Sequence, residues 1–282
     1  MHSVQERMTF TMQRLNAQRS TALVCAALLV AGSMLRPSAA ADAPVAPQRI
    51  LGILGGMGPE ATANLYQEIV RLTPAEKDQD HIPTLIFSFP QTPDRTTAIQ
   101  NNDRSIIPYL VEGTTRLEKA GASLIALPCN TVHFFHDDMQ RAVKIPVLHM
   151  IRETADVVAR NHPNARRIGL LASDGTVATG LYEREFSARG MKLVYPDEAI
   201  QKDCVMKAIY GIKAGGDKQA SEELLFTAGQ NVEHKGAEVI VLGCTEIPLA
   251  FNPRRASVPV VNATRVLAEA AIREYFQEAK KQ

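Results

Sequence analysis

Short apolar runs alternate with segments of helical spacing along most of the chain. Ala61, Leu65 and Ile69 recur at the spacing of one helix face, whereas the apolar runs are short enough to predict strands. This alternation is typical of an α/β protein whose strands are mainly parallel. We expect strands at residues 49–54, 84–88, 124–127, 147–148, 167–171, 192–194, 239–242 and 258–261.

The second half of this pattern repeats the first. Residues 49–66 align with residues 167–182, and Cys129 and Cys244 then follow at nearly equal distances along the chain. The repeat predicts two similar α/β lobes related by a pseudo-twofold axis, each a mainly parallel sheet flanked by helices. Because ligands bind at the carboxyl ends of such strands, we expect the active site in the cleft between the lobes.

The repeat also suggests where the chain crosses between the lobes. The Ile-Pro-Val run at residues 145–147 matches the Val-Pro-Val run at residues 258–260, and a long helical pattern follows each. We therefore expect a first lobe over residues 49–146 and a second over residues 147–259. The C-terminal segment, residues 260–282, is expected to pack back on the first lobe.

The first part of the chain has the pattern of a secretory signal. Arginines precede an apolar run at residues 22–35, and small residues follow it up to Ala41. A membrane anchor is the alternative, but a run of about fourteen residues is shorter than the roughly 20 that span a bilayer. We expect residues 1–41 to be a cleaved signal peptide and residues 42–48 a linker, with export to a periplasm and no stable membrane insertion.

Composition and charge narrow the class of partner. The chain has 282 residues, 45% hydrophobic and 22% charged, which is ordinary for a globular protein. Residues 1–41 carry four arginines and one glutamate, so without them the formal charge changes from +1 to −2. A nearly neutral surface gives no electrostatic reason to expect binding to nucleic acid.

Cysteine usage points to chemistry rather than to a disulfide framework. Cys25 falls in the expected signal, which leaves Cys129, Cys204 and Cys244, an odd number. Cys204 has no counterpart in the other half, and we interpret it as structural. Cys129 and Cys244 each follow a strand and precede a short polar pair. We expect both to stay unbridged, because a substrate carbon would have to fit between them.

Two opposed thiols suit proton transfer at a carbon. Removing a proton from one face and adding one to the other needs a base and an acid, and Cys129 and Cys244 could exchange these roles. A thiol has a pKa near 8.5 that falls at a helix N-terminus. We expect Asn130-Thr131 and Thr245-Glu246 to begin and cap the following helices.

Neighbouring residues allow other interpretations. A metal site through Cys129, His133 and His136 is conceivable, but a second ligand cluster is missing. His133 lies one helical turn from the thiol, where it would either tune that thiol or pack in the core. The glycines at residues 55–58 lack dinucleotide-loop spacing, and with Pro59 they are better suited to cradle a small anion.

These motifs resemble the aspartate/glutamate racemase family, especially its cofactor-independent aspartate racemase branch. The segments that carry the resemblance are residues 52–62, 90–96, 128–133, 201–203, 212–215 and 243–247, spread over nearly the whole expected mature chain. It implies an amino-acid substrate, a homodimer, and a reaction without pyridoxal phosphate or metal. It also implies that Cys129 and Cys244 are the catalytic acid and base.

The same resemblance implies a set of substrate-binding residues. Arg95 and Lys213 match basic positions that are associated with recognising an acidic substrate. The remaining positions surround the cysteines or lie in loops after strands: Met57, Asn130, Thr131, Thr176, Thr245 and Glu246.

Departures from the family pattern affect the expected substrate. Glutamate racemases open with an Asp-Ser-Gly type motif and follow the second cysteine with His-Tyr, whereas this chain has a Gly-Gly-Met-Gly opening and Glu246-Ile247. The pattern favours aspartate, or a wider set that includes glutamate. The alternatives are a hydantoin racemase, a dicarboxylate cis-trans isomerase, or an exported amino-acid-binding protein without catalysis.

Overall fold

The computed structural model describes residues 49–279. The predicted signal peptide, residues 1–41, and the predicted linker, residues 42–48, lie outside this range. Within it, no helix is both long and apolar enough to cross a membrane.

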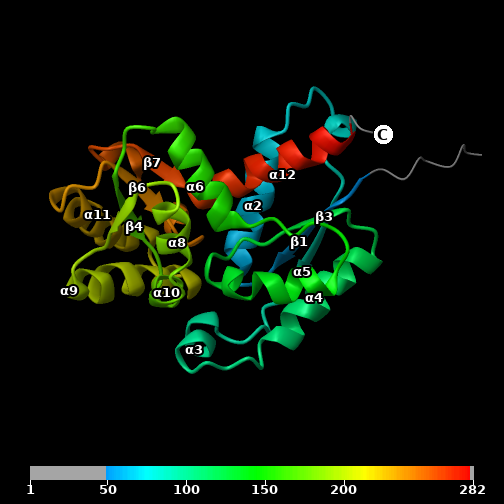
Figure 1. Ribbon diagram of the computed structural model, residues 1–282, viewed down its shortest axis with the longest axis horizontal. Helices are drawn as coiled ribbons and strands as arrows, with labels where there is room; N and C mark the ends of the chain where they lie inside the picture. Colours follow the sequence, from blue (N-terminus) through cyan, green and yellow to red (C-terminus); the bar gives the residue numbers. More distant parts are fainter. Residues whose placement is uncertain (1–48, 280–282) are drawn as a thin grey trace, which may run out of the picture. The chain divides into compact units, whose positions relative to one another are not determined.

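The first sheet has three parallel strands in the order β2-β1-β3. Figure 1 labels β1 and β3. They are β1 (Leu51–Gly55), β2 (Thr84–Ser88) and β3 (Leu124–Ala126). The central strand β1 is buried along its whole length, as expected for a strand covered on both faces. Two amphipathic helices flank this sheet, α2 (Pro59–Leu72) and α4 (Ile107–Lys119).

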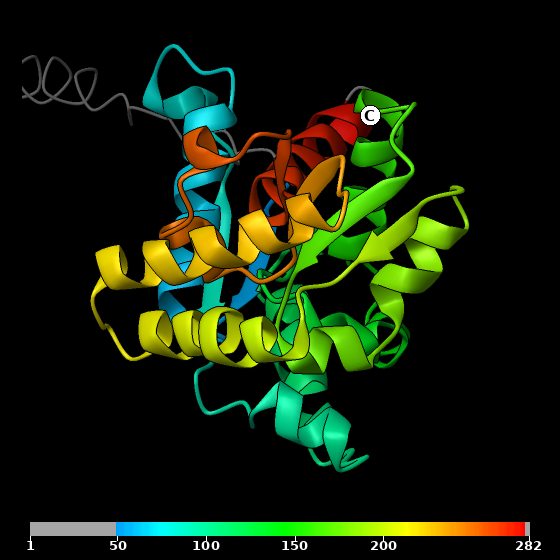
Figure 2. The same ribbon diagram turned by 90° about the vertical axis from the view of Figure 1, so that its left-hand side faces the viewer.

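The second sheet has four parallel strands in the order β5-β4-β6-β7. They are β4 (Arg167–Leu171), β5 (Lys192–Val194), β6 (Val239–Leu242) and β7 (Val260–Asn262). The helices α6 (Met150–Asn161) and α8 (Leu181–Ser187) cover one face, and α10 (Lys207–Lys213) and α11 (Lys218–His234) cover the other. Figure 2 shows these last two helices side by side.

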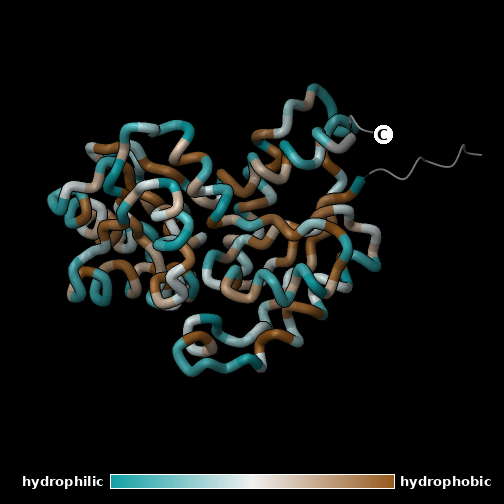
Figure 3. Tube along the Cα trace, viewed as in Figure 1, coloured by the Kyte–Doolittle hydropathy of each residue, from teal (hydrophilic) through white to brown (hydrophobic). Residues whose placement is uncertain are grey.

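Shorter helices connect these layers. They are α3 (Arg95–Gln100), α5 (His136–Ala142), α7 (Asp174–Ala178) and α9 (Glu198–Ile200), with a π-helical turn at Gln201–Met206. Single 3₁₀ turns lie at Asp78–Asp80, Thr131–Phe135, Ile247–Leu249 and Pro253–Arg255. In Figure 3 the segments around the strands are hydrophobic, whereas the exposed turn after α3, residues 101–105, is hydrophilic.

The internal repeat is visible in the hydrogen bonds. The central strands β1 and β4 are each flanked by the next two strands of their own half. In β3 the backbone N–H of Ile125 donates to the carbonyl of Pro146, and in β6 the N–H of Ile240 donates to the carbonyl of Pro259. The two crossovers therefore join their sheets in the same way, and the expected α/β fold with two lobes is confirmed.

The lobe boundaries differ by a few residues from those we expected at 146/147 and 259/260. Val147 forms a parallel bridge with Ile125, so it belongs to the first sheet. The strand β7 pairs with β6, so residues 260–262 belong to the second sheet rather than to the first lobe. Each crossover run completes the sheet that it leaves before the chain changes lobe. The following helix α12 (Ala263–Ala279) then packs on α2 and the first sheet.

Candidate active site

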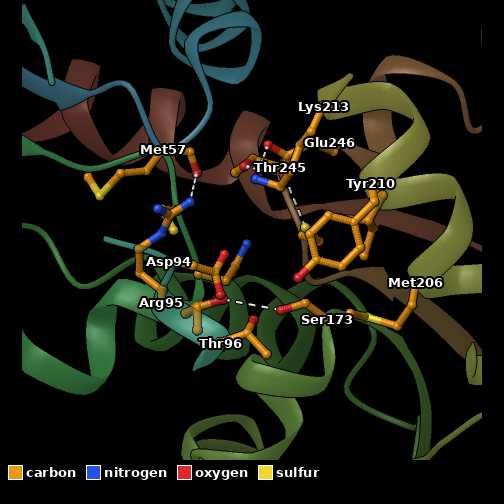
Figure 4. Close-up of a pocket in the computed structure, with 15 residues that line it drawn as sticks. Met57, Asp94, Arg95, Thr96, Ser173, Met206, Tyr210, Lys213, Thr245 and Glu246 are labelled. Carbon is orange, nitrogen blue, oxygen red and sulfur yellow. Dashed lines mark hydrogen bonds and ion pairs between the residues drawn. The ribbon is translucent and has the colours of Figure 1, made fainter. Parts of the chain in front are cut away.

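The carboxyl ends of the central strands in both lobes open into one pocket. Figure 4 shows Met57 and Arg95 on one side of it, and Tyr210 and Lys213 on the other. Its walls come from the loops after β1, β2, β3, β4 and β6 and from the segment that includes α10. The lining residues are Met57, Asp94, Arg95, Thr96, Cys129, Asn130, Thr131, Ser173, Met206, Ile209, Tyr210, Lys213, Cys244, Thr245 and Glu246.

The structure brings the two matched cysteines into this pocket. Cys129 follows β3 and Cys244 follows β6, and their exposed fractions are 6% and 7%. Both are free thiols, as is the buried Cys204, which does not line the pocket. The side chain of Thr245 joins the two loops by donating to the carbonyl of Pro128 at 3.3 Å.

The chain after each cysteine is not the capped α-helix that we expected. Each cysteine is followed by a short 3₁₀ turn, at Thr131–Phe135 and at Ile247–Leu249, and neither turn has a side-chain cap. Pro248 lies inside the second turn and has no N–H to donate, which limits regular helix there. The helix N-terminus that was expected to lower the thiol pKa is therefore missing.

At Cys244 the pKa in fact moves in the opposite direction. Burial, and then the charge of Glu246, raise the pKa of this thiol well above its usual value, and Lys213 offsets only part of the effect. The thiol donates to Oε2 of Glu246 at 3.1 Å. Cys244 is therefore a protonated thiol near neutral pH.

Glu246 also forms an ion pair with Lys213, the last residue of α10. Their Oε1 and Nζ atoms are 2.9 Å apart, and Glu246 is 3% exposed. Burial is the largest single influence on the pKa of Lys213 and lowers it, but Glu246 and the two cysteines together outweigh burial and raise the lysine pKa. Lys213 is therefore charged inside the pocket.

Arg95 supplies the second cation of the site. Its guanidinium donates to the carbonyls of Thr92, Pro93 and Met57 at 3.2, 3.0 and 3.3 Å. Asp94 accepts from the N–H of Thr97 and caps α3, which begins at Arg95. Within the part of the chain that the structure describes, no carboxylate is within ion-pair distance of Arg95. Its charge is thus available to a ligand.

A group of hydroxyls crosses the pocket from one lobe to the other. Thr131 Oγ1 shares hydrogen bonds with Thr176 Oγ1 at 2.7 Å and with Ser173 Oγ at 3.2 Å. Thr176 does not line the pocket itself but holds this group together. Ser173 is a pocket residue that we did not predict, although it lies in the same loop as Thr176.

Asn130 offers an unused donor. Its Oδ1 accepts from the hydroxyl of Tyr182 at 2.7 Å, while its Nδ2 is buried without any hydrogen-bond partner. A buried donor without a partner is costly unless a ligand or water satisfies it. The amide nitrogen of Asn130 is therefore a candidate binding group for an anionic ligand.

His133 packs in the core and does not contact the thiol of Cys129. Its Nδ1 hydrogen-bonds the carbonyl of Cys129 at 2.8 Å, and its Nε2 accepts from the N–H of Met150 at 3.1 Å. Burial, and then the neighbouring His136, lower the pKa of His133 to about 4. Across residues 49–279, no cluster of three or more His, Cys, Asp or Glu could hold a metal ion.

Nine of the ten predicted site residues line the pocket, and Thr176 lies directly behind it. Sequence reasoning missed the wall formed by Met206, Ile209 and Tyr210. These residues precede Lys213 at intervals of three and four, so they share one helix face with it. That spacing was the signal that could have identified them.

A family model described as Asp/Glu/Hydantoin racemase matches residues 54–271. The broad specificity amino-acid racemase RacX of Bacillus subtilis is 28% identical over 231 residues, 80% of this chain and 98% of that protein. The aspartate racemase of Picrophilus torridus superimposes with a TM-score of 0.73 at 30% identity, over 81% of this chain and 94% of that chain. A glutamate racemase of Francisella tularensis shares the fold, with a TM-score of 0.61 at 15% identity over 83% of this chain and 82% of that chain.

Proposed function

The chain belongs to the Asp/Glu/Hydantoin racemase family, and from this premise we propose that it interconverts L- and D-aspartate by a two-base mechanism. Cys129 and Cys244 would act on opposite faces of the α-carbon, one as thiolate base and the other as thiol acid. The observation that carries the proposal is the pair of buried free thiols from matching positions of two lobes, both lining one pocket. The proposed reaction uses no cofactor and no metal.

The binding groups around the thiols suit an amino acid. The unpaired amide nitrogen of Asn130 and the hydroxyls of Thr131 and Thr245 are suited to the α-carboxylate. Arg95, which has no ion-pair partner among residues 49–279, is suited to a second carboxylate on the side chain. An acidic amino acid would use both groups, and aspartate is therefore the substrate that we propose.

The substrate range is a separate question within this proposal. The similar P. torridus protein is named for aspartate, whereas the similar B. subtilis protein is named for broad specificity. Lys213 is already paired with Glu246, so Arg95 is the cation available to select an acidic side chain. We expect aspartate to be the best substrate and Arg95→Met to lose that preference, with smaller changes for neutral amino acids.

Racemisation in deuterated water tests the mechanism. Cys129→Ser and Cys244→Ser should each lower kcat for aspartate racemisation by at least about a thousandfold, because each removes one of the two proton-transfer groups. Each variant keeps one thiol, so it can still exchange the α-hydrogen of one enantiomer of aspartate with deuterium from the solvent. The control is Cys204→Ser, because Cys204 is buried outside the pocket. Its kcat for aspartate racemisation should stay close to that of the unmodified protein.

Full racemase activity in either active-site variant would refute the two-thiol mechanism. Activity that needs added pyridoxal phosphate, or that is lost with a chelator, would refute the cofactor-free reaction. A hydantoin racemase is the second candidate, because the family description includes that activity. Turnover of a 5-substituted hydantoin but not of aspartate would favour it, and saturable aspartate binding without turnover would favour a binding protein.

We also propose export, which the N-terminal sequence pattern predicts, and self-association, which the family resemblance implies. A cleaved signal at residues 1–41 would place the mature protein in a periplasm. The mass of the protein recovered from a periplasmic extract would show whether cleavage occurs. Light scattering on the purified protein would show whether it is the homodimer that we expect.

A further inference from the structure

The internal repeat gives the two thiols different neighbours. The residue two positions after Cys129 is Thr131, and the residue two positions after Cys244 is Glu246. The Thr131 hydroxyl hydrogen-bonds other hydroxyls, whereas the Glu246 carboxylate accepts directly from the Cys244 thiol at 3.1 Å. Equivalent positions in the two lobes therefore carry different chemistry, one a neutral hydroxyl and the other an anion.

The carboxylate of Glu246 is held by contacts on both oxygens. Lys213 contacts Oε1 at 2.9 Å, while Cys244 and Thr245 contact Oε2 at 3.1 and 3.3 Å. With the side chain 3% exposed, water does not screen these contacts effectively. The other titratable groups that line the pocket are Asp94, Arg95, Cys129 and Tyr210.

This arrangement restricts how Cys244 can act as a base. Loss of the thiol proton to solvent would leave a thiolate and a carboxylate in contact within a buried site, and Lys213 could neutralise only one of them. Transfer of the proton to Glu246 avoids this. The S–H bond breaks, its electron pair stays on sulfur, and an O–H bond forms at Oε2, so the charge of the pair is unchanged.

We propose that Glu246 keeps Cys244 protonated in the resting enzyme and takes up its proton when Cys244 has to act as the base. The proposal rests on the racemisation proposed above and gives Glu246 a role in proton transfer rather than in substrate binding. In the resting enzyme Cys129 is then the base and Cys244 the acid. The second form, with these roles reversed, is reached through the protonated carboxyl of Glu246.

The first test is the pH dependence of kcat/KM for aspartate in the unmodified protein and in Glu246→Gln. The alkaline limb reports loss of the acid's proton in the free enzyme. Without the anion beside it, the Cys244 thiol becomes more acidic, so the midpoint of the alkaline limb should shift to a pH lower by about one to three units. The acid limb should move less.

Two further variants control for this result. Glu246→Asp keeps the carboxylate but withdraws it from the thiol, and its alkaline limb should lie between those of the unmodified protein and Glu246→Gln. Glu112→Gln removes the same charge from an exposed residue of α4 that pairs with Arg116 and does not line the thiol pocket, and both limbs should stay in place.

The second test does not depend on turnover. Alkylation by iodoacetamide across a pH series, with each cysteine quantified by peptide mass spectrometry, reports thiolate formation at Cys129 and Cys244 separately. In Glu246→Gln the Cys244 midpoint should fall by about one to three pH units, more than that of Cys129. If the unmodified protein shows no racemisation, the proposed function fails, and the alkylation profile still decides the role of Glu246.

A purely structural role for Glu246 gives a different outcome. Glu246→Gln would then lower kcat/KM by the same factor at every pH, and the alkylation midpoints of both cysteines would be unchanged. Either result would overturn the proposal. Glu246→Asp decides the question in the same way if Glu246→Gln does not fold.

Discussion

One side chain of this site is oriented by another from the opposite lobe. Tyr182 on α8 donates to the Oδ1 of Asn130, which leaves the Nδ2 of that amide directed away from Tyr182 and without a partner. Burial holds the pKa of Tyr182 well above its usual range, so its hydroxyl stays a donor at every relevant pH. The amide of Asn130 cannot flip without breaking this bond.

We predict that Tyr182→Phe weakens substrate binding more than it slows turnover. Without the phenol, the amide of Asn130 can present either its oxygen or its nitrogen, so KM for aspartate should rise by about three- to tenfold, the value of one hydrogen bond. Steady-state kinetics measures this. The control is Tyr195→Phe, because the hydroxyl of Tyr195 contacts Glu183 away from the pocket. A fall in kcat at constant KM would contradict the positioning role.

At the scale of elements, a buried histidine joins the loop after β3 to the start of α6. His133 bonds the carbonyl of Cys129 through one ring nitrogen and the N–H of Met150 through the other. Both bonds need the neutral ring, with the proton on Nδ1. A second proton on Nε2 would remove the acceptor for Met150 and would instead be donated to the carbonyl of Leu148, 3.2 Å away. Burial is the main cause of the lowered pKa of about 4.

This contact predicts a loss of stability in mild acid. The pKa of His133 is about 6.5 in the unfolded chain but about 4 in the folded one. The contribution of the neutral ring to the free energy of unfolding is therefore fully present above pH 6.5 and is lost as the pH falls toward 4. The full shift corresponds to about 3 kcal/mol. Urea unfolding at pH 7 and pH 5 should show about 2 kcal/mol of this effect, because the full shift is reached only below pH 4. His133→Gln should reduce the difference. Equal stability of the unmodified protein at both pH values would contradict this.

The elements were more predictable than the contacts between them. Apolar runs placed β2, β4, β5 and β6 with their exact bounds, because a short apolar run between helical segments marks a strand whether it is buried, as β6 is, or partly exposed at a sheet edge, as β2 and β5 are. The prediction that capped α-helices begin directly after the two cysteines was wrong, because residues suited to capping do not distinguish an α-helix from the 3₁₀ turns that the structure has there.

In the candidate site, too, the residues were predictable from the sequence, whereas the contacts between them were not. Its cysteines and most lining residues follow from motifs at strand ends. The pairing of Lys213 with Glu246 joins residues 33 positions apart, and that of Tyr182 with Asn130 joins residues 52 positions apart. No local pattern encodes these contacts, because the first depends on how α10 packs beside the loop after β6, and the second on how the two lobes pack.

At the scale of the whole described chain, the pocket between the lobes is nearly closed. Its cavity volume of about 20 Å³ has room for about one water molecule. An amino acid is larger, so we expect the walls to separate as it enters. The helix α3 begins at Arg95 and the helix α10 ends at Lys213, and these two residues lie on opposite sides of the pocket (Figure 4). We therefore expect these two helices to move apart.

We predict that a bound amino acid reduces the motion of these two helices. In the double variant Cys129→Ser/Cys244→Ser, which cannot racemise its ligand, DL-aspartate should slow amide hydrogen exchange in α3 and α10 several-fold. Exchange in α12, which packs away from the pocket, should not change. Uniform exchange with and without aspartate would contradict closure around the ligand.

The difference between Thr131 and Glu246 has a consequence for the ancestry of the fold. An ancestor assembled from two separate, identical half-chains would have had the same residue at both positions, either two hydroxyls or two carboxylates. One of each became possible only after the coding sequence of the half-chain had been duplicated, so that each position could mutate alone. The duplication therefore preceded the difference between the surroundings of the two thiols.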